Sequence, residues 1–270
     1  CARQRGLEVT RLAVPAGRAP APEDLRRALR PRTKLAAIQW VNHETGTVLP
    51  VREYAAICRD AGVPLFVDAM QALGKLAIEV DTLGADLLAC SAHKIGGPAG
   101  SAALWVRRGV ELDPLLHGGA QERGRRGGTP DVLAHVGFGA ACEQLAERLA
   151  TQPRIAALRD RAELALLAHP GAVGNAPSGP RVATVSNVSV RGWRGEALIA
   201  ALDVEGVAAS SGAACSSGLS EPSPVLLAMH GDEPWRAGAA LRLSFGVETT
   251  EIEVESALAV IARVLARPPA

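Results

Sequence analysis

Two polar residues follow short apolar runs in the first half of the chain. Asp68 comes directly after PLFV, and Lys94 comes four residues after LLAC, behind Ser91 and His93 and ahead of GGP. Each apolar run has the length of a buried strand, and ligands of open α/β sheets bind at the carboxyl ends of the strands. The sequence therefore predicts a carboxylate and an amine at a ligand-binding edge.

A carboxylate, an amine and small polar donors are the groups that an aldehyde cofactor such as pyridoxal phosphate requires. Lys94 would form the Schiff base, and Asp68 would hold the pyridinium proton, because a nearby carboxylate favours the charged ring. Gln71 lies one helical turn further along. Each residue also has a plainer interpretation. Asp68 could only cap a helix, Lys94 could be a solvated lysine, and His93 could be a hydrogen-bonded structural histidine.

The elements that must position these residues alternate between short apolar runs and helix-like stretches up to about residue 110. Such alternation is typical of α/β organisation, in which crossover helices join parallel strands. The segments 91–100 and 117–130 are expected to be loops, the second because of its many glycines and arginines. We expect a helix at 51–61 and strands at 7–9, 35–40, 64–67, 86–90 and 102–106.

The second half of the chain has a different composition. The stretch 132–168 is rich in Ala, Leu, Glu and Arg at helical spacing, and the Gly, Pro and Ser content of 171–180 marks a boundary loop. The remainder is expected to be α+β, with strands near 182–190 and 241–245 and helices near 196–202 and 250–265. We therefore expect two domains, 1–150 and 151–270.

Bulk properties narrow the class of function. The chain has 29 Lys and Arg against 28 Asp and Glu, so it lacks a strong field for nucleic acid or anionic membrane. Its five cysteines, at 1, 58, 90, 142 and 215, are odd in number and widely spaced, which argues against a disulfide framework and against a metal site. With no long apolar stretch, we expect a cytoplasmic, soluble protein. Because the first residue is Cys and not Met, a fragment or a processed product is expected.

Six runs of the sequence, in order, resemble the successive motifs of the cysteine desulfurases. The resemblance implies pyridoxal-phosphate fold type I, with a large domain built on a mainly parallel sheet, incomplete at its N-terminal side, and a smaller α+β C-terminal domain. The last but one run is similar to the branch that serves iron–sulfur cluster assembly and tRNA thiolation. The runs are VNHETG (41–46), FVDAMQALGK (66–75), SAHKIGGPAG (91–100), HGGAQERGRRGGT (117–129), SSGAACSSG (210–218) and ALRLSFG (240–246).

The resemblance also implies roles for individual residues. Cys215 would take sulfur from L-cysteine as a persulfide, with release of L-alanine, and pass it to a sulfur-acceptor protein. Arg242 would grip the substrate carboxylate with two parallel donors, beside Asn42. His93 would also assist proton movement. The residues implied to contact the cofactor are Asn42, His43, Asp68, Gln71, Ser91, His93, Lys94 and Thr129, the last lent by the partner subunit of a homodimer.

The surroundings of the cysteines favour Cys215 as the nucleophile. It lies among Ser, Gly and Ala, whereas Cys58 and Cys90 lie in apolar helix and strand patterns and are expected to be small buried residues. An ordinary thiol is only a few per cent thiolate at neutral pH, so a nearby base or cation is expected to activate Cys215.

Two departures from the family pattern keep alternatives open. His43 stands where the family has a second asparagine, and the family has a further upstream segment with a phosphate-binding loop and a histidine that stacks on the ring. One alternative is a related lyase or aminotransferase of the same fold, for example one that acts on selenocysteine. Another is a fragment or paralogue without catalysis that serves as a scaffold or dimerisation partner. The joint presence of Asp68, Lys94, Cys215 and Arg242 opposes the second.

Overall fold

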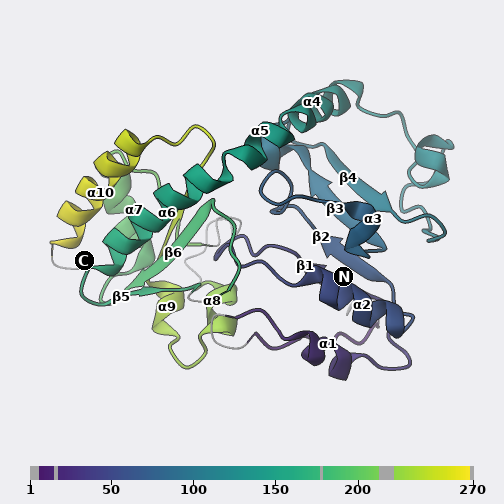
Figure 1. The fold of residues 1–270 in the computed structure, drawn as a ribbon, viewed down its shortest axis with the longest axis horizontal. Coiled ribbons are helices and arrows are strands. Elements are labelled where there is room, and N and C mark those ends of the chain that lie inside the picture. Colours follow the sequence, from purple (N-terminus) through teal and green to yellow (C-terminus); the bar gives the residue numbers. More distant parts are fainter. Residues whose placement is uncertain (1–5, 15–17, 177–178, 213–221, 268–270) are drawn as a thin grey trace. The chain divides into compact units, whose positions relative to one another are not determined.

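The computed structural model describes residues 6–14, 18–176, 179–212 and 222–267 (Figure 1). The chain separates into two compact units. Unit 2 consists of residues 31–40 and 51–149, and unit 1 consists of the described parts of 1–30, 41–50 and 150–270. The expected domains 1–150 and 151–270 stay a prediction. In the structure, residues 41–50 group with the C-terminal part of the chain.

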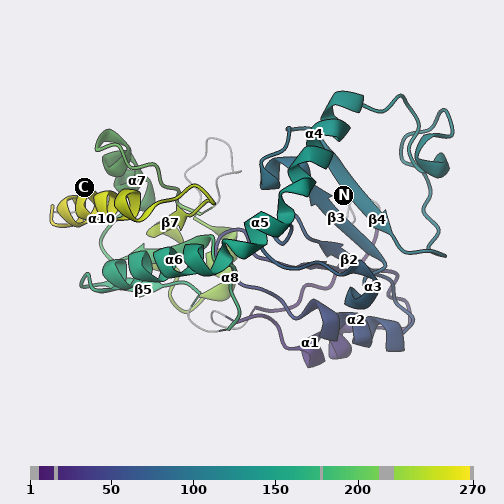
Figure 2. The same cartoon turned by 45° about the horizontal axis from the view of Figure 1, so that its top comes forward.

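Unit 2 is built on a four-stranded sheet in which the strands follow one another in chain order. Its first three strands are parallel and the fourth is antiparallel. Helix α2 (Val51–Asp60) contacts β2 and also α3 (Val80–Leu83), which lies close to it in Figure 2. The strands are β1 (Ala36–Gln39), β2 (Leu65–Asp68), β3 (Leu87–Ser91) and β4 (Ala102–Val106).

The connection between β3 and β4 carries the lysine, and one expectation for unit 2 is corrected there. Strand β4 runs antiparallel to β3, because the connection 92–101 is shorter than the dozen or so residues that a parallel crossover requires. Within that connection, residues expected to be a loop form the 3-10 helix η2 (Ala92–Ile95). Gly96 ends η2 with a φ of 80°, a left-handed conformation that glycine adopts without strain.

Unit 1 is built on an antiparallel sheet of β5 (Ala172–Gly174), β6 (Val185–Val190) and β7 (Ala240–Ser244). Strand β6 is buried on both faces. Alternate side chains point to opposite faces of a strand. Val188 and Val190 pack in a core with side chains of α6 (Gln152–Leu167), α7 (Gly195–Val204) and α10 (Glu251–Leu265). Asn187 and Ser189, one position along, supply polar groups to the other face.

The helices that complete the fold begin at recognisable caps. Asp131 caps α4 (Val132–Glu143), Ser223 caps α8 (Pro224–Met229), and Thr250 forms a capping box at the start of α10. Each of these side chains accepts a hydrogen bond from a backbone N–H that the helix leaves unpaired. The remaining helices are α1 (Pro22–Ala28), α5 (Leu145–Ala150), α9 (Trp235–Gly238) and the 3-10 helix η3 (Gln121–Gly124).

Most expected elements are confirmed, and three are wrong. The stretch 132–168 is not one helix but α4, α5 and α6, and α6 opens with Pro153, a residue suited to a first helical turn. The expected boundary loop 171–180 contains the short strand β5. The expected strand at 7–9 does not form, and Leu7 and Val9 are exposed. Within the described ranges, no helix combines the length and the apolar character needed to span a membrane.

Candidate functional site

In unit 2, Asp68 and the residues before Lys94 come from two neighbouring strands. Asp68 is the last residue of β2 and pairs in register with Ala89 of β3. Its Oδ1 atom accepts a hydrogen bond from the N–H of Met70 at 2.9 Å, which fixes the turn after β2. A carboxylate has two oxygens, so holding this turn is compatible with a second interaction. The structure thus places Asp68 at the carboxyl edge of the parallel strands.

Strand β3 ends at Ser91, and η2 then carries His93 and Lys94. The hydroxyl of Ser91 lies 2.8 Å from Nδ1 of His93, so the two residues predicted to contact a phosphate are hydrogen-bonded to each other. Ser91 is buried, whereas His93 and Lys94 are exposed. The amine of Lys94 is therefore accessible to a small molecule, and its backbone is held by a short helix between two strands.

Two further predicted cofactor contacts also lie in unit 2. Oε1 of Gln71 accepts a hydrogen bond from Nζ of Lys75 at 2.5 Å, so its amide nitrogen is the end that could donate to a ring oxygen. Thr129 is exposed in the segment between β4 and α4. That segment is folded on itself by hydrogen bonds from the N–H of Gly127 to the carbonyl of Leu116 at 2.9 Å and from the N–H of Gly128 to Gln121 at 3.2 Å.

Asn42, His43 and Arg242 lie in unit 1. The side-chain carbonyl of Asn42 accepts from the N–H groups of Glu44 and Thr45 at 2.9 and 3.0 Å, so it holds the turn that this segment forms. Nη1 of Arg242, in β7, donates to the backbone carbonyls of Gly212 at 2.7 Å and His43 at 3.3 Å. The structure therefore brings His43 and Arg242 together, while the carbonyl end of Asn42 has a local structural role.

Cys215 lies outside the described residues. Three other cysteines are described, and burial raises the pKa of the thiol in each of them. Asp86 raises the pKa of Cys58 further, and Cys142 does the same for Cys90. The thiolate is the nucleophilic form of cysteine, so these three thiols are poor nucleophiles at neutral pH.

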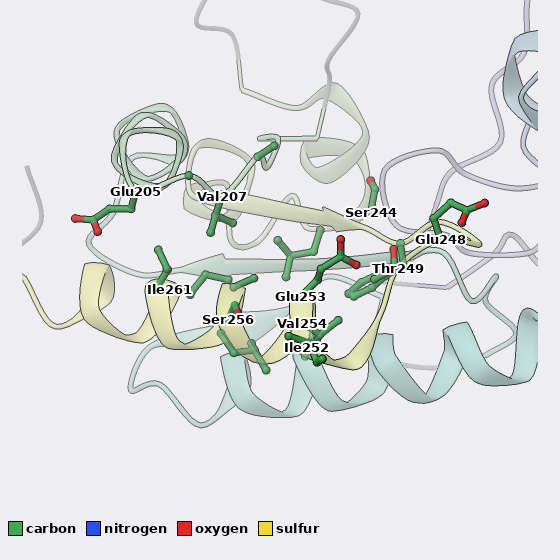
Figure 3. A pocket seen from close by; sticks show the side chains of 18 residues that line it. Glu205, Val207, Ser244, Glu248, Thr249, Ile252, Glu253, Val254, Ser256 and Ile261 are labelled. Atoms are coloured by element: carbon green, nitrogen blue, oxygen red, sulfur yellow. The ribbon is translucent and has the colours of Figure 1, made fainter.

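A pocket of about 630 Å³ lies in unit 1 between α10, β7 and the chain that follows α7 (Figure 3). Its lining is largely apolar, and Glu205, Glu248 and Glu253 lie at its border. Of the predicted site residues that the structure describes, none lines this pocket. Among the described residues, no three His, Cys, Asp or Glu side chains come together as a metal site.

Comparison with known proteins decides the family of the chain. The aminotransferase class-V family matches residues 1–257. The cysteine desulfurase of Gluconacetobacter diazotrophicus is 41% identical, over 98% of this chain and 66% of its own length. The chain belongs to the cysteine desulfurase family. Another desulfurase, the IscS-like cysteine desulfurase of Mycobacterium tuberculosis, is 38% identical over 97% of this chain and 68% of its own. The chain thus spans about two thirds of the length of these desulfurases.

Solved structures confirm the expected α/β fold of a desulfurase. A NifS-like protein superposes with a TM-score of 0.89 at 31% identity, over 98% of this chain and 70% of its own. The protein described as SspA in complex with cysteine superposes with a TM-score of 0.76 at 30% identity, over 92% of this chain and 69% of its own.

The residues of unit 2 fit the pyridoxal phosphate that the desulfurase family implies. A carboxylate (Asp68), an accessible amine (Lys94) and a hydroxyl (Ser91) lie at or just beyond the carboxyl ends of adjacent strands. These are the donor types needed for a pyridine nitrogen, an aldehyde and a phosphate. The donor set is therefore chemically suited to this cofactor.

Reasoning from the sequence missed two polar residues of the desulfurase chain. Ser101 lies directly before Ala102, the residue of β4 that pairs with Ser91. It is buried, and its hydroxyl has no hydrogen-bond partner among the described residues. Glu44 is only 1% exposed although it is a carboxylate. Glu44 lies inside the quoted run VNHETG, but an acidic residue gives no sequence signal of burial, because acidic side chains are mostly exposed.

Proposed function

We propose that this protein is a pyridoxal-phosphate-dependent cysteine desulfurase, which converts L-cysteine to L-alanine and keeps the sulfur as a persulfide. One observation carries the proposal. In a chain of the desulfurase family, Asp68 ends β2 and Lys94 follows the adjacent parallel strand β3, so both lie at the carboxyl edge, where α/β sheets bind ligands.

The residues of unit 2 would hold the cofactor. Lys94 would bind its aldehyde covalently, and Asp68 would keep a proton on the pyridine nitrogen, since a carboxylate favours the charged ring. Ser91, with its hydroxyl against His93, would donate to the phosphate. When bound, pyridoxal phosphate supplies the electron sink that allows the Cβ–S bond of an amino acid to break. The amine of Lys94 and the ring of His93 are then the groups available to move protons.

Arg242 and Cys215 would bind and attack the substrate. Arg242 would bind the carboxylate of L-cysteine through its guanidinium, which forms two parallel hydrogen bonds to a carboxylate. Sγ of Cys215 would attack the sulfur of the substrate. An S–S bond forms, the Cβ–S bond breaks, and its electron pair leaves with the carbon atom, which takes up a proton. The products are L-alanine and a Cys215 persulfide, so atoms and electrons balance.

Sulfur acceptor and subunit arrangement are further parts of this proposal. The terminal sulfur would pass to an acceptor protein of iron–sulfur cluster assembly or of tRNA thiolation. A homodimer is supported by exposed apolar side chains in the segment that carries Thr129 and in the helix α4 that follows it, since large exposed apolar surfaces mark interfaces. Leu115 is 82% exposed, and Leu133 of α4 is 86% exposed.

The assignment of Lys94 is tested by absorption spectroscopy of the purified protein with pyridoxal phosphate. We expect a band near the edge of the visible range, which borohydride reduction fixes to Lys94. Lys94→Ala should lose this band, while Lys34→Ala, which also removes an exposed lysine of unit 2, should keep it. An unchanged band in Lys94→Ala would show that another amine holds the cofactor.

A further inference from the structure

Glu44 is the most deeply buried carboxylate among the described residues, with 1% of its surface exposed. Burying an ionised carboxylate costs free energy unless hydrogen bonds or opposite charges compensate. Nε2 of His43 lies 3.7 Å from Oε1 of Glu44, but the side chain of His43 is itself partly exposed. The other contacts of this carboxylate indicate what its burial achieves.

The first contact is with Ser223. The hydroxyl of Ser223 donates to Oε2 of Glu44 at 2.5 Å and accepts from the N–H of Leu226 at 3.0 Å. The same serine is the N-cap of α8, and its N–H donates to the carbonyl of Ala237 at 3.2 Å. Glu44 therefore fixes the position at which the chain enters α8.

The second contact is with Gly212, on the other side of the segment 213–221. A Cβ atom placed on Gly212 would lie 2.6 Å from Oε2 of Glu44, so the carboxylate packs directly against the glycine backbone. Gly212 has a φ of 114°, which other residues adopt only with strain. Its carbonyl accepts from Nη1 of Arg242, which also binds the carbonyl of His43. The turn around Glu44 thus contacts Gly212 in two ways, by direct packing of the carboxylate and through the side chain of Arg242.

Glu44 itself is held in place by the sheet of unit 1. Nδ2 of Asn187, in the buried strand β6, donates to the carbonyl of Glu44 at 2.9 Å. The N–H of Glu44 donates to Oδ1 of Asn42 at 2.9 Å. A side chain positions its partners well when its own backbone is held by hydrogen bonds to a rigid element.

We propose that Glu44 is a positioning residue for sulfur transfer, which holds Gly212 and Ser223 and so fixes both ends of the segment that carries Cys215. Fixing the ends of a chain segment reduces the conformations open to the residues between them. This inference rests on the proposed role of Cys215.

Limited proteolysis tests whether Glu44 holds Gly212 and Ser223 in place, and it does not require an active enzyme. Thermolysin cleaves on the amino side of leucine, so Leu219 gives it a target between Gly212 and Ser223. Cleavage requires local release of the chain. A hydrogen bond to a charged group stabilises by an amount equivalent to about tenfold in an equilibrium constant. We therefore expect Glu44→Gln to raise the initial cleavage rate about tenfold. Ser223→Ala should do the same, and the double variant should be cleaved no faster than Ser223→Ala.

The matched control is Ser186→Ala, which removes the hydrogen bond that another buried serine of unit 1 donates to a glutamate, from Ser186 to Glu163 at 2.8 Å. It should leave the cleavage rate unchanged. Steady-state kinetics then test the effect on sulfur transfer. Glu44→Gln should lower kcat about tenfold with an unchanged KM for L-cysteine, because Glu44 orders the attacking residue and does not bind the substrate.

An unchanged cleavage rate in folded Glu44→Gln would overturn the proposal, and so would faster cleavage with an unchanged kcat. A wild-type protein that formed no persulfide on Cys215 would instead refute the proposed function. In that case the cleavage rates would still decide whether Glu44 holds the two ends.

Discussion

At the scale of single residues, burial distinguishes three cysteines of this protein from Lys94. Burial raises the pKa of Cys58, Cys90 and Cys142, which keeps these thiols protonated. Lys94, by contrast, is exposed, although Ala92 and Ile95 of the same 3-10 helix are buried. The residues that are suited to chemistry and those that only fill the core are therefore separated at the level of single side chains.

His230 provides a pH-dependent test at this scale. It is 7% exposed, and burial is the main reason that its pKa lies below the ordinary value of 6.5, with the charge of Arg236 acting in the same direction. Its hydrogen bond to the carbonyl of Asn175 and the charge of Glu233 oppose the shift only in part. The folded protein thus binds a proton at this site less readily than the unfolded chain.

The contribution of neutral His230 to the free energy of unfolding should therefore be complete above pH 6.5. The free energy of unfolding should fall as the pH drops from 6.5 towards the lowered pKa of His230. Urea unfolding between pH 5 and pH 7.5 measures this dependence. His230→Gln should flatten the curve in that window, while His135→Gln, at an exposed position, should not. A wild-type curve that rose towards low pH would contradict the predicted sign.

The elements are stabilised at their ends by side chains that the sequence displays openly. Thr250 and Glu253 form a reciprocal capping box at α10. Oγ1 of Thr250 accepts from the N–H of Glu253 at 3.3 Å, and Oε2 of Glu253 accepts from the N–H of Thr250 at 2.8 Å. This spacing, followed by an apolar pattern, predicts a helix start. The predicted helix 250–265 is confirmed with α10 at Glu251–Leu265.

Removing this cap gives a prediction at the scale of the element. Thr250→Ala should lower the free energy of unfolding by about 1 kcal/mol, because an N–H at the start of α10 loses its acceptor. Ser256→Ala removes an exposed hydroxyl from the middle of the same helix and should change stability by less than about 0.5 kcal/mol. Equal effects of the two substitutions in urea unfolding would show that the cap does not stabilise the helix.

How much could be predicted from the sequence depends on the range of the interactions. Local apolar runs predict strands that end at Val67 and Cys90, and the structure confirms both strands, each ending one residue later, at Asp68 and Ser91. Strand β5 has only three residues, too few to show an alternating pattern. The contacts of Glu44 with Gly212 and Ser223 join residues far apart in the chain. No local pattern reports such contacts, so these parts of the site emerged only from the structure.

At the scale of the whole molecule, the residues assigned to catalysis are distributed over two compact units. Asp68 and Lys94 belong to unit 2, whereas Asn42 and Arg242 belong to unit 1. The segment of unit 2 before and within α4 also exposes Leu115, Leu133 and Val136. We expect a second copy of the chain to cover these side chains.

Light scattering after size-exclusion chromatography tests that expectation. The purified protein should have the mass of two chains, and Leu133→Asp should reduce it to the mass of one, because a buried charge without a partner disfavours association. Leu164→Asp replaces a leucine of α6 that is 73% exposed in unit 1 and should leave the mass unchanged. A monomeric wild-type protein would contradict the proposed homodimer.

The most direct test of the central claim is to locate the sulfur after the protein has been mixed with pyridoxal phosphate and L-cysteine. Alkylation followed by tandem mass spectrometry identifies which cysteine carries an additional sulfur atom. We predict a persulfide on Cys215, one L-alanine released for each sulfur transferred, and none on Cys58, Cys90 or Cys142. Cofactor bound through Lys94 without a persulfide on Cys215, or a persulfide on one of the other three cysteines instead, would contradict the account.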